Sequence, residues 1–395
     1  MKLALKPVAI GEVVERSQTW NPSRSSADEV FQYIDLSAVD QDAKLITGAR
    51  EVSCGEAPSR ARQLIVSGDI LVSTVRPNLN GVARVPEQLD GATASTGFCV
   101  LRANKTKANG AYLFHWVKSP AFVSDMVSKA TGASYPAVSD RIIFDSQIPL
   151  PPLPEQKRIA AILDAADALR AKRREALAQL DALLQSSFLT LFGDPVANPM
   201  GWKQVELGDL VADDDRINYG VVQPGDEHPG GRPLIRVGDF VGGELDLSGI
   251  KFIDPQIDAQ YERSRLLGTE LLVSCVGSIG TVCRVPLAAK GHNIARAVAR
   301  VPLGPKVERE FMLFCLRSAG VQNYFTNETR TVSQPTLNIG LIKTATVTLP
   351  PLPLHQKFAA IVESIERQKT THRAHLAELD ALFAALQHRA FCGEL

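Results

Sequence analysis

The strongest constraint on this chain is a segment that occurs twice. PPLPEQKRIAAIL occupies residues 151–163 and PPLPLHQKFAAIV occupies residues 350–362, so the copies align without a gap at an offset of 199 residues. At the same offset Phe192 falls on Phe391. A repeat of this length indicates a duplicated unit. We therefore interpret the chain as two halves, each a body of roughly 150 residues followed by one long helix.

Each copy of the segment predicts a long helix. Prolines are tolerated in a first helical turn because the missing N–H has no partner there, and Glu155 favours the positive end of the helix dipole. Apolar residues recur at helical spacing as far as Leu191, and Gly193 ends the pattern. Residues 155–191 as one helix would span about 55 Å. The second helix has a polar middle at residues 368–373.

A single helix of this length with one apolar stripe needs a partner, and the nearest candidate is the other copy. The first helix leads from the first body to the second, so a paired second helix must run back. The predicted fold class is therefore α+β, with two mixed α/β bodies separated by a pair of long antiparallel coiled-coil helices. The two halves form a pseudo-twofold internal repeat.

The two bodies share one predicted framework. Strand patterns interrupted by turn residues predict β-hairpins at residues 68–85 and 268–285. Apolar spacing predicts a helix at residues 111–129, with a counterpart at residues 311–320. Residues 142–150 then read as a last strand before the proline run.

The loop tips differ between the bodies, which predicts one scaffold with two different recognition surfaces. Arg, Asn, Gln, Ser and Tyr in these loops suit contacts to base edges and phosphates. Turn chemistry alone also selects several of these residues, so a structural role stays open for each. The candidate DNA-binding residues are Arg24, Arg76, Asn78, Asn80, Ser134, Tyr135 and Arg141 in the first body, and Asn218, Tyr219, Gln223, Ser278, Arg296, Gln334 and Asn338 in the second.

Net charge argues against a strong non-specific nucleic-acid binder. The 395 residues carry 43 basic and 43 acidic side chains, so the formal net charge is zero. Counterion release from DNA requires a basic excess that this chain lacks. An interpretation as a DNA-binding protein must therefore rest on local clusters and on resemblance.

Cysteine usage and hydropathy point to a soluble chain in a reducing cytoplasm. None of the six cysteines forms a C-x-x-C pair, so neither a zinc site nor a disulfide framework is indicated. The sequence shows no apolar run of bilayer length and no sustained apolar segment typical of a secretory signal.

Catalytic and metal signatures are weak. The sequence contains no P-loop, G-x-G-x-x-G or G-x-S-x-G motif. Asp145 with Glu155-x-Lys157 imitates a nuclease, but four prolines separate the two carboxylates. His372, His375 and Glu378 could share a helix face as metal ligands, although a solvated polar stretch explains them as well. We predict no catalytic and no metal site.

The whole chain resembles the specificity subunit of type I restriction-modification enzymes. The resemblance is carried by the two proline-led helices and by the polar loops TGASYP and VSQPTLN, at residues 131–136 and 332–338. It implies target-recognition domains at residues 1–150 and 194–349. It also implies spacer helices at residues 151–193 and 350–395.

The same resemblance implies a non-catalytic function in DNA recognition. Each domain would read one half of a gapped, asymmetric double-stranded DNA target, and the helices would set the gap and dock two modification subunits. Restriction subunits would join to form the nuclease. S-adenosylmethionine, ATP and Mg would be bound by those partners, with no cofactor in this chain. The alternative is a protein–protein scaffold with two binding heads.

Overall fold

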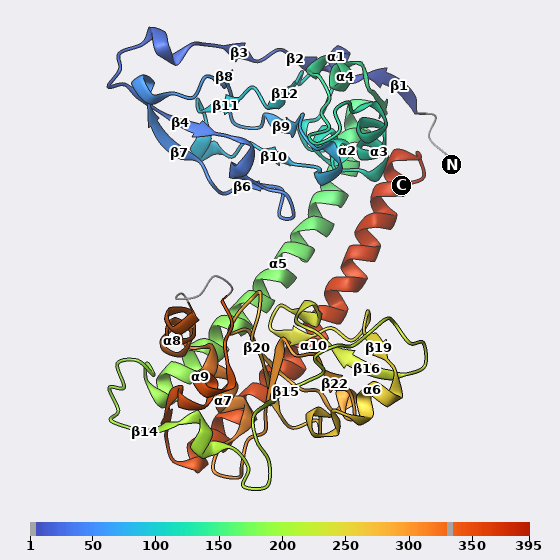
Figure 1. Cartoon of the computed structure of the whole chain (residues 1–395). Helices are drawn as coiled ribbons and strands as arrows, with labels where there is room; N and C mark the ends of the chain where they lie inside the picture. Colours follow the sequence, from blue (N-terminus) through green and yellow to red (C-terminus); the bar gives the residue numbers. More distant parts are fainter. Residues whose placement is uncertain (1–4, 330–334) are drawn as a thin grey trace. The chain divides into compact units, whose positions relative to one another are not determined.

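The computed structural model describes residues 5–329 and 335–395. It divides into two compact units (Figure 1). Unit 1 comprises Met1–Ala176 and His372–Leu395, and unit 2 comprises Leu177–Thr371. Each unit therefore contains part of both long helices. The assignment of the chain to two recognition domains and two separate spacer segments stays a prediction.

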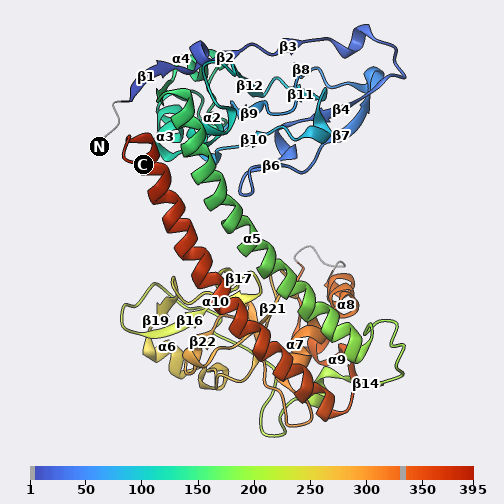
Figure 2. The same cartoon turned by 180° about the vertical axis from the view of Figure 1, so that it is seen from behind.

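The two long helices predicted from the repeat are confirmed. Helix α5 spans Leu153–Phe192 and helix α10 spans Leu352–Phe391. In unit 1, Arg170 of α5 pairs with Asp380 of α10, and Arg158 reaches the backbone oxygen of Leu395. Residues with higher numbers in α5 thus contact residues with lower numbers in α10. The same holds in unit 2, so the pairing is antiparallel, as predicted (Figure 2).

Unit 1 has two main sheets. One has the strand order β10-β9-β12-β2 and the other β3-β8-β11-β4-β7, with β4 and β11 parallel. The strands are β1 (Lys6–Ala9), β2 (Val14–Glu15), β3 (Gln18–Thr19), β4 (Val30–Ile34), β5 (Val39–Asp40), β6 (Leu45–Ile46), β7 (Arg50–Ser53), β8 (Ala61–Leu64), β9 (Ile70–Ser73), β10 (Val82–Arg84), β11 (Thr93–Ser95), β12 (Phe98–Ala103) and β13 (Gln147–Leu150). The first predicted hairpin is confirmed as antiparallel β9 and β10.

Unit 2 repeats the central part of this plan. Its main sheets have the orders β15-β23-β20-β21 and β19-β16-β22, with β16 and β22 parallel. The strands are β14 (Lys203–Glu206), β15 (Asn218–Tyr219), β16 (Arg232–Ile235), β17 (Phe240–Val241), β18 (Glu244–Leu245), β19 (Lys251–Ile253), β20 (Leu271–Ser274), β21 (Val282–Arg284), β22 (Asn293–Ile294), β23 (Val298–Val301) and β24 (Thr346–Leu349). The second predicted hairpin is confirmed as β20 and β21.

The helix predicted at residues 111–129 is wrong as a single element. The structure has α2 (Gly110–Val117) followed by α3 (Pro120–Lys129). Proline lacks the N–H that a continuing helix needs, and the Ser119 hydroxyl accepts the N–H of Phe122 to start a new helix. Unit 2 breaks at the equivalent place, between α7 (Arg309–Arg317) and α8 (Ala319–Thr329).

The strand predicted at residues 142–150 is correct only in its second part. Residues 140–145 form helix α4 (Asp140–Asp145), and β13 follows. The Ser139 hydroxyl accepts the N–H of Ile142, which caps the short helix. Unit 2 places α9 (Ile339–Thr344) before β24. The remaining short helices are α1 (Ile10–Val13) and α6 (Pro255–Ala259).

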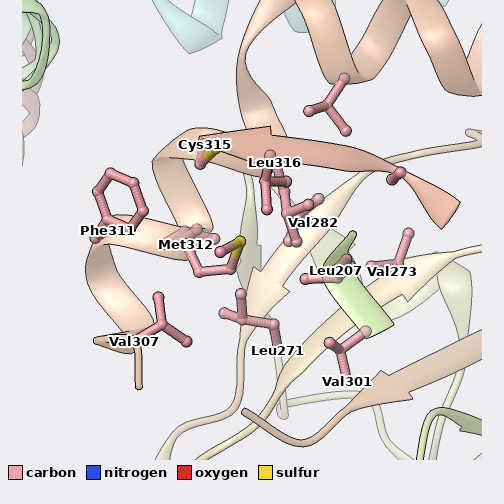
Figure 3. Close-up of a cluster of buried hydrophobic side chains, with 14 of the residues drawn as sticks. Leu207, Leu271, Val273, Val282, Val301, Val307, Phe311, Met312, Cys315 and Leu316 are labelled. Atoms are coloured by element: carbon pink, nitrogen blue, oxygen red, sulfur yellow. The ribbon is translucent and has the colours of Figure 1, made fainter. Parts of the chain in front are cut away.

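The long helices contribute directly to the cores of the units. Figure 3 shows Met312 and Leu316 of α7 near Leu271 and Val282 of the unit 2 strands, whereas Phe311 lies farther from these strands. The same cluster includes Phe188 and Phe192 of α5 and Phe358 of α10. Ile159 and Leu163 of α5 join Phe383 of α10 in the unit 1 core.

The repeated helix starts bury different polar groups. The amide of Gln156 is satisfied, since it accepts the N–H of Asn109 and donates to the carbonyl of Pro151. His355 occupies the corresponding position in α10 and is fully buried, stacked on Phe311 at 3.9 Å between ring centroids. Neither of its ring nitrogens has a hydrogen-bond partner within the described part of the chain. Burial lowers the pKa of His355 to about 4, so the ring is neutral at pH 7.

Candidate nucleic-acid interface

Two loops of unit 1 pack together at one end of the β9–β10 hairpin. The Arg76 N–H donates to the Pro136 carbonyl at 2.7 Å, and the Val138 N–H donates to the Thr74 carbonyl at 2.9 Å. We call these loops, residues 74–80 and 131–138, edge 1. The structure thereby brings Arg76, Asn78 and Asn80 of one loop together with Ser134 and Tyr135 of the other.

Arg76 and Tyr135 form an exposed stack on edge 1. The Arg76 guanidinium lies 4.7 Å from the centroid of the Tyr135 ring, and Tyr135 is 67% exposed. Stacking orients the planar guanidinium while its N–H groups stay available. Arg76 also has a left-handed backbone, with φ of 50°. Such strain in a surface turn is typical of binding loops.

Asn80 has a structural role in the same turn. Its side-chain amide donates to the Lys118 carbonyl at 3.2 Å, and its own carbonyl accepts Lys44 Nζ at 2.6 Å. Its φ is 47°, a conformation that asparagine tolerates better than most residues. The amide group of Asn80 therefore ties the turn to the end of α2, whereas Asn78 is exposed.

Arg24 and Arg141 are positioned by other elements. Arg24 ends a short 3₁₀ turn and is exposed. Arg141 lies on α4, 3.4 Å from Asp145, and both side chains are highly exposed. It lines a cavity of about 740 Å³ together with Arg16 and Gln63.

Four segments of unit 2 pack together in the corresponding way. The Leu337 N–H donates to the Cys275 carbonyl at 2.9 Å, and the Arg296 N–H donates to the Val221 carbonyl at 2.8 Å. A Cβ at Gly220 would lie 1.6 Å from the carbonyl oxygen of Ile294, so only glycine permits this approach. We call these segments edge 2, residues 218–223, 275–280, 295–297 and 335–338.

Edge 2 contains framework residues and exposed residues. The Tyr219 hydroxyl donates to the Leu337 carbonyl at 3.0 Å, and burial raises the pKa of Tyr219 to about 12. Asn338 caps α9 by accepting the N–H of Leu341. Ser278, Gln223 and Arg296 are exposed.

Asn218 completes the placement of the candidates in unit 2. Its side-chain amide donates to the Arg263 carbonyl at 2.8 Å, while its Oδ1 is buried and has no hydrogen-bond partner among the residues that the structure describes. Gln334 lies outside the described residues. The assignment of all fourteen candidates to DNA contacts stays a prediction.

Two basic residues beside edge 1 were missed by sequence reasoning. The Arg60 carbonyl accepts the N–H of Thr96, and the adjacent Gly97 carbonyl accepts the N–H of Thr74. This places Arg60, which is exposed, at the same end of the sheet. Lys44 is the second, through its hydrogen bond to Asn80. No local sequence motif marks either residue, because its place beside edge 1 depends on how strands distant in the sequence pair.

A buried arginine holds the segment that leads into β15. Arg300 donates to Glu270 at 2.9 Å through Nε and to Asp215 at 2.8 Å through Nη1. The side chains of Arg300 and Glu270 are 3% and 1% exposed. Burial opposes ionisation of Asp215, but the hydrogen bonds from Arg300 and from the backbone of Arg216, together with the positive charges of both arginines, outweigh it, so the pKa of Asp215 lies below its usual value. Arg300 thus anchors Asp215, three residues before Asn218.

No metal centre is evident among residues 5–329 and 335–395, where no group of three or more His, Cys, Asp or Glu side chains could hold an ion. His372, one of the weighed ligands, contacts the Arg173 guanidinium through Nδ1. Across that same part of the chain, no helix combines the length and apolarity needed to cross a membrane.

The chain is similar to known specificity subunits. The type I restriction modification DNA specificity domain matches residues 47–179. The type I restriction enzyme EcoBI specificity subunit of Escherichia coli is 30% identical over 330 residues, which covers 75% of this chain and 68% of the relative. The chain belongs to the family of type I restriction enzyme specificity subunits.

Further relatives agree with this family. The EcoKI specificity subunit of Escherichia coli strain K12 is 25% identical over 75% of this chain and 68% of its own length. A solved structure described as the structural basis of complex assembly and conformational transition of the type I R-M system is 28% identical, with a TM-score of 0.58 and full coverage of both chains. The S subunit from M. genitalium is 13% identical with a TM-score of 0.59, which shows the shared fold. The resemblance identified from the repeat is confirmed.

Proposed function

We propose that this specificity subunit reads a gapped, asymmetric DNA target, with one half-site read by edge 1 and the other by edge 2. The observation that carries this proposal is the pairing of a repeated framework with unlike exposed residues. Edge 1 presents the Arg76–Tyr135 stack, whereas edge 2 presents Arg296 and Gln223. Direct readout depends on the donors and acceptors that reach base edges, so unlike side chains select unlike half-sites.

We assign spacing and docking to the helix pair. Large leucines on α5 and α10 are exposed, including Leu169 at 53%, Leu183 at 49% and Leu382 at 49%. Apolar groups of this size on a helix surface fit a protein partner. Two modification subunits would dock there and supply methyl transfer with S-adenosylmethionine, and restriction subunits would supply ATP- and Mg-dependent steps. The chain itself is proposed to be non-catalytic and cytoplasmic.

The function is tested by sequencing modified bases in cells that express this chain with a modification subunit. Recognition by two unlike edges predicts one gapped motif, with adenines modified on both strands. The alternative, a scaffold with two protein-binding heads, predicts no motif. Absence of a motif from cells in which the complex assembles would reject the proposed function.

Arg76→Ala is expected to weaken recognition of one half-site only. A bidentate arginine contact to a base contributes about 1–3 kcal/mol of discrimination. Modification should therefore tolerate substitutions in that half-site, with the other half-site read as before. The measurement is methylation of duplexes that vary each half-site separately. Arg50→Ala is the matched control, because Arg50 also lies over an aromatic ring, Tyr33 at 5.5 Å, but on β7. Relaxation at both half-sites would contradict the assignment.

Inserting one helical turn into α5 near Ala176, with a matching insertion in α10 near Thr371, is expected to lengthen the gap. Both positions lie where unit 1 ends and unit 2 begins, so each packed core stays intact. Four helical residues add about 6 Å, on the order of two base pairs. The modified motif should keep both half-sites. A change in half-site letters with an unchanged gap would reject the spacer role.

A further inference from the structure

The two long helices carry charges of the same sign at three positions related by the repeat offset. Asp167 and Arg170 of α5 correspond to Glu366 and Lys369 of α10, and Asp181 of α5 corresponds to Asp380 of α10. The first two positions are separated by three residues, so they share a helix face. Antiparallel pairing places Asp380 of α10 beside Arg170 of α5, and Asp181 of α5 beside Lys369 of α10.

In unit 1 these residues form a continuous chain of ion pairs. Arg170 contacts Asp167 at 2.7 Å within α5 and Asp380 of α10 at 2.6 Å. The Arg170 guanidinium also lies 4.4 Å from the ring centroid of Phe383. A planar guanidinium held by two carboxylates and an aromatic face has a defined orientation.

Unit 2 contains the corresponding chain. Lys369 contacts Glu366 at 2.8 Å within α10 and Asp181 of α5 at 2.7 Å. The Lys369 side chain is largely buried. The pairing therefore follows the internal repeat residue by residue, although lysine stands where α5 has arginine.

Each chain of ion pairs extends from the long helices to the body of its unit through one additional cation. In unit 1, Lys118 Nζ lies 2.6 Å from Asp167, and the Lys118 side chain is only 7% exposed. Its ammonium also lies 4.5 Å from the Phe114 ring centroid. In unit 2, Arg284 lies 3.7 Å from Glu366 and 3.0 Å from Glu244. Burial makes the unit 1 contact directional and weakly screened by salt.

Both cations are attached to the recognition edges. The Lys118 carbonyl, at the end of α2, accepts the Asn80 side chain of edge 1. Arg284 is the last residue of β21, the strand that leaves the edge 2 turn. A short covalent or hydrogen-bonded path thus joins each edge to a carboxylate on a long helix.

We propose that Lys118 and Arg284 are positioning residues that fix the orientation of each recognition edge on the helix pair and so restrict the gap length that the subunit accepts. This inference rests on the proposed DNA function. When the orientation of each edge on the helices is fixed, the two edges can bind half-sites at one separation only. When one edge can reorient, the subunit also accepts half-sites at neighbouring separations.

The test uses the chain in complex with its modification subunits and the motif found for the wild-type complex. Methylation rates are compared on duplexes whose half-sites are separated by the native gap and by one base pair more or less. Lys118→Met keeps the apolar stem and removes the charge. It should reduce the preference for the native gap about tenfold, with unchanged half-site letters, because orientation rather than base contact is lost. Arg284→Met should act in the same direction.

Two further variants separate positioning from folding. Lys118→Met with Asp167→Leu removes both charges of the contact while Arg170 keeps its contact with Asp380, and it should retain the relaxed gap preference with recovered stability. Lys129→Met is the control, since Lys129 pairs along its own helix with Asp125, at 2.7 Å, and is exposed. It should leave the gap preference unchanged.

The outcomes distinguish this inference from the proposed function. No motif with the wild-type complex would reject the function itself. A wild-type motif with unchanged gap preference in the folded double variant would overturn the positioning role. Altered half-site letters in Lys118→Met would also overturn it, because Lys118 would then act as a base reader.

Discussion

Arg300→Met is expected to lower the free energy of unfolding of unit 2 by about 3–5 kcal/mol. The substitution removes a cation that two carboxylates share, Glu270 and Asp215. Glu270 is buried and would lose its cationic partner, although it still accepts the N–H groups of Leu267 and Gly268. Removing one member of a buried ion pair costs more than the pair contributes, because the remaining charge cannot recover its hydration.

Hydrogen–deuterium exchange gives the local measurement for this variant. Peptides that cover β20 and β23 should lose protection, whereas peptides of β9 and β12 in unit 1 should keep it. Lys306→Met is the control, since Lys306 is exposed six residues later in the chain. Methylation at the half-site read by edge 2 should fall as well, because Arg300 anchors Asp215 ahead of β15. Equal protection in Arg300→Met and wild type would show that the network contributes little to stability.

Phe188→Ala is expected to destabilise unit 2 by about 3–5 kcal/mol. Phe188 of α5 is 2% exposed and packs against Phe311 of α7 and Phe358 of α10, with ring centroids 5.9 Å and 5.5 Å away. Truncation removes buried apolar area and leaves a cavity that the neighbouring rings cannot fill without moving.

The adjacent Leu189→Ala provides the control for Phe188→Ala. Leu189 is 41% exposed, so its truncation should cost less than about 1 kcal/mol. Urea unfolding followed by exchange in unit 2 peptides compares the two. Similar losses for both variants would mean that α5 is a spacer that merely touches the body. A large difference would establish α5 as part of the unit 2 core.

The sequence predicted the long helices because their signals are local. Proline at the start, glycine at the end and apolar spacing in between act within one or two helical turns. The duplication then gave the pairing, since two matching stripes joined by one body can meet only in antiparallel order. The same reliance on local spacing failed at residues 111–129. There the apolar pattern continues across Ser119 and Pro120, although the backbone hydrogen bonding does not.

The candidate site was predictable only in part. Arg76, Tyr135 and Arg296 lie on edges that the structure assembles, as exposed polar loop residues. Tyr219 and Asn338 were selected by the same criteria, yet their polar atoms bond to the framework. Residue type cannot separate these roles, because a hydroxyl or amide satisfies a backbone group as well as a base.

From the sequence alone, the repeat and its periodicity determined that the chain has two related halves, two long helices and unlike loop tips. Only the tertiary structure decided which loops meet, that Arg300 is buried between Glu270 and Asp215, and that Lys118 reaches Asp167. Helical periodicity is a property of neighbouring residues, whereas these contacts join positions 30 or more residues apart. Their partners are selected by strand register and helix packing, which no local pattern specifies.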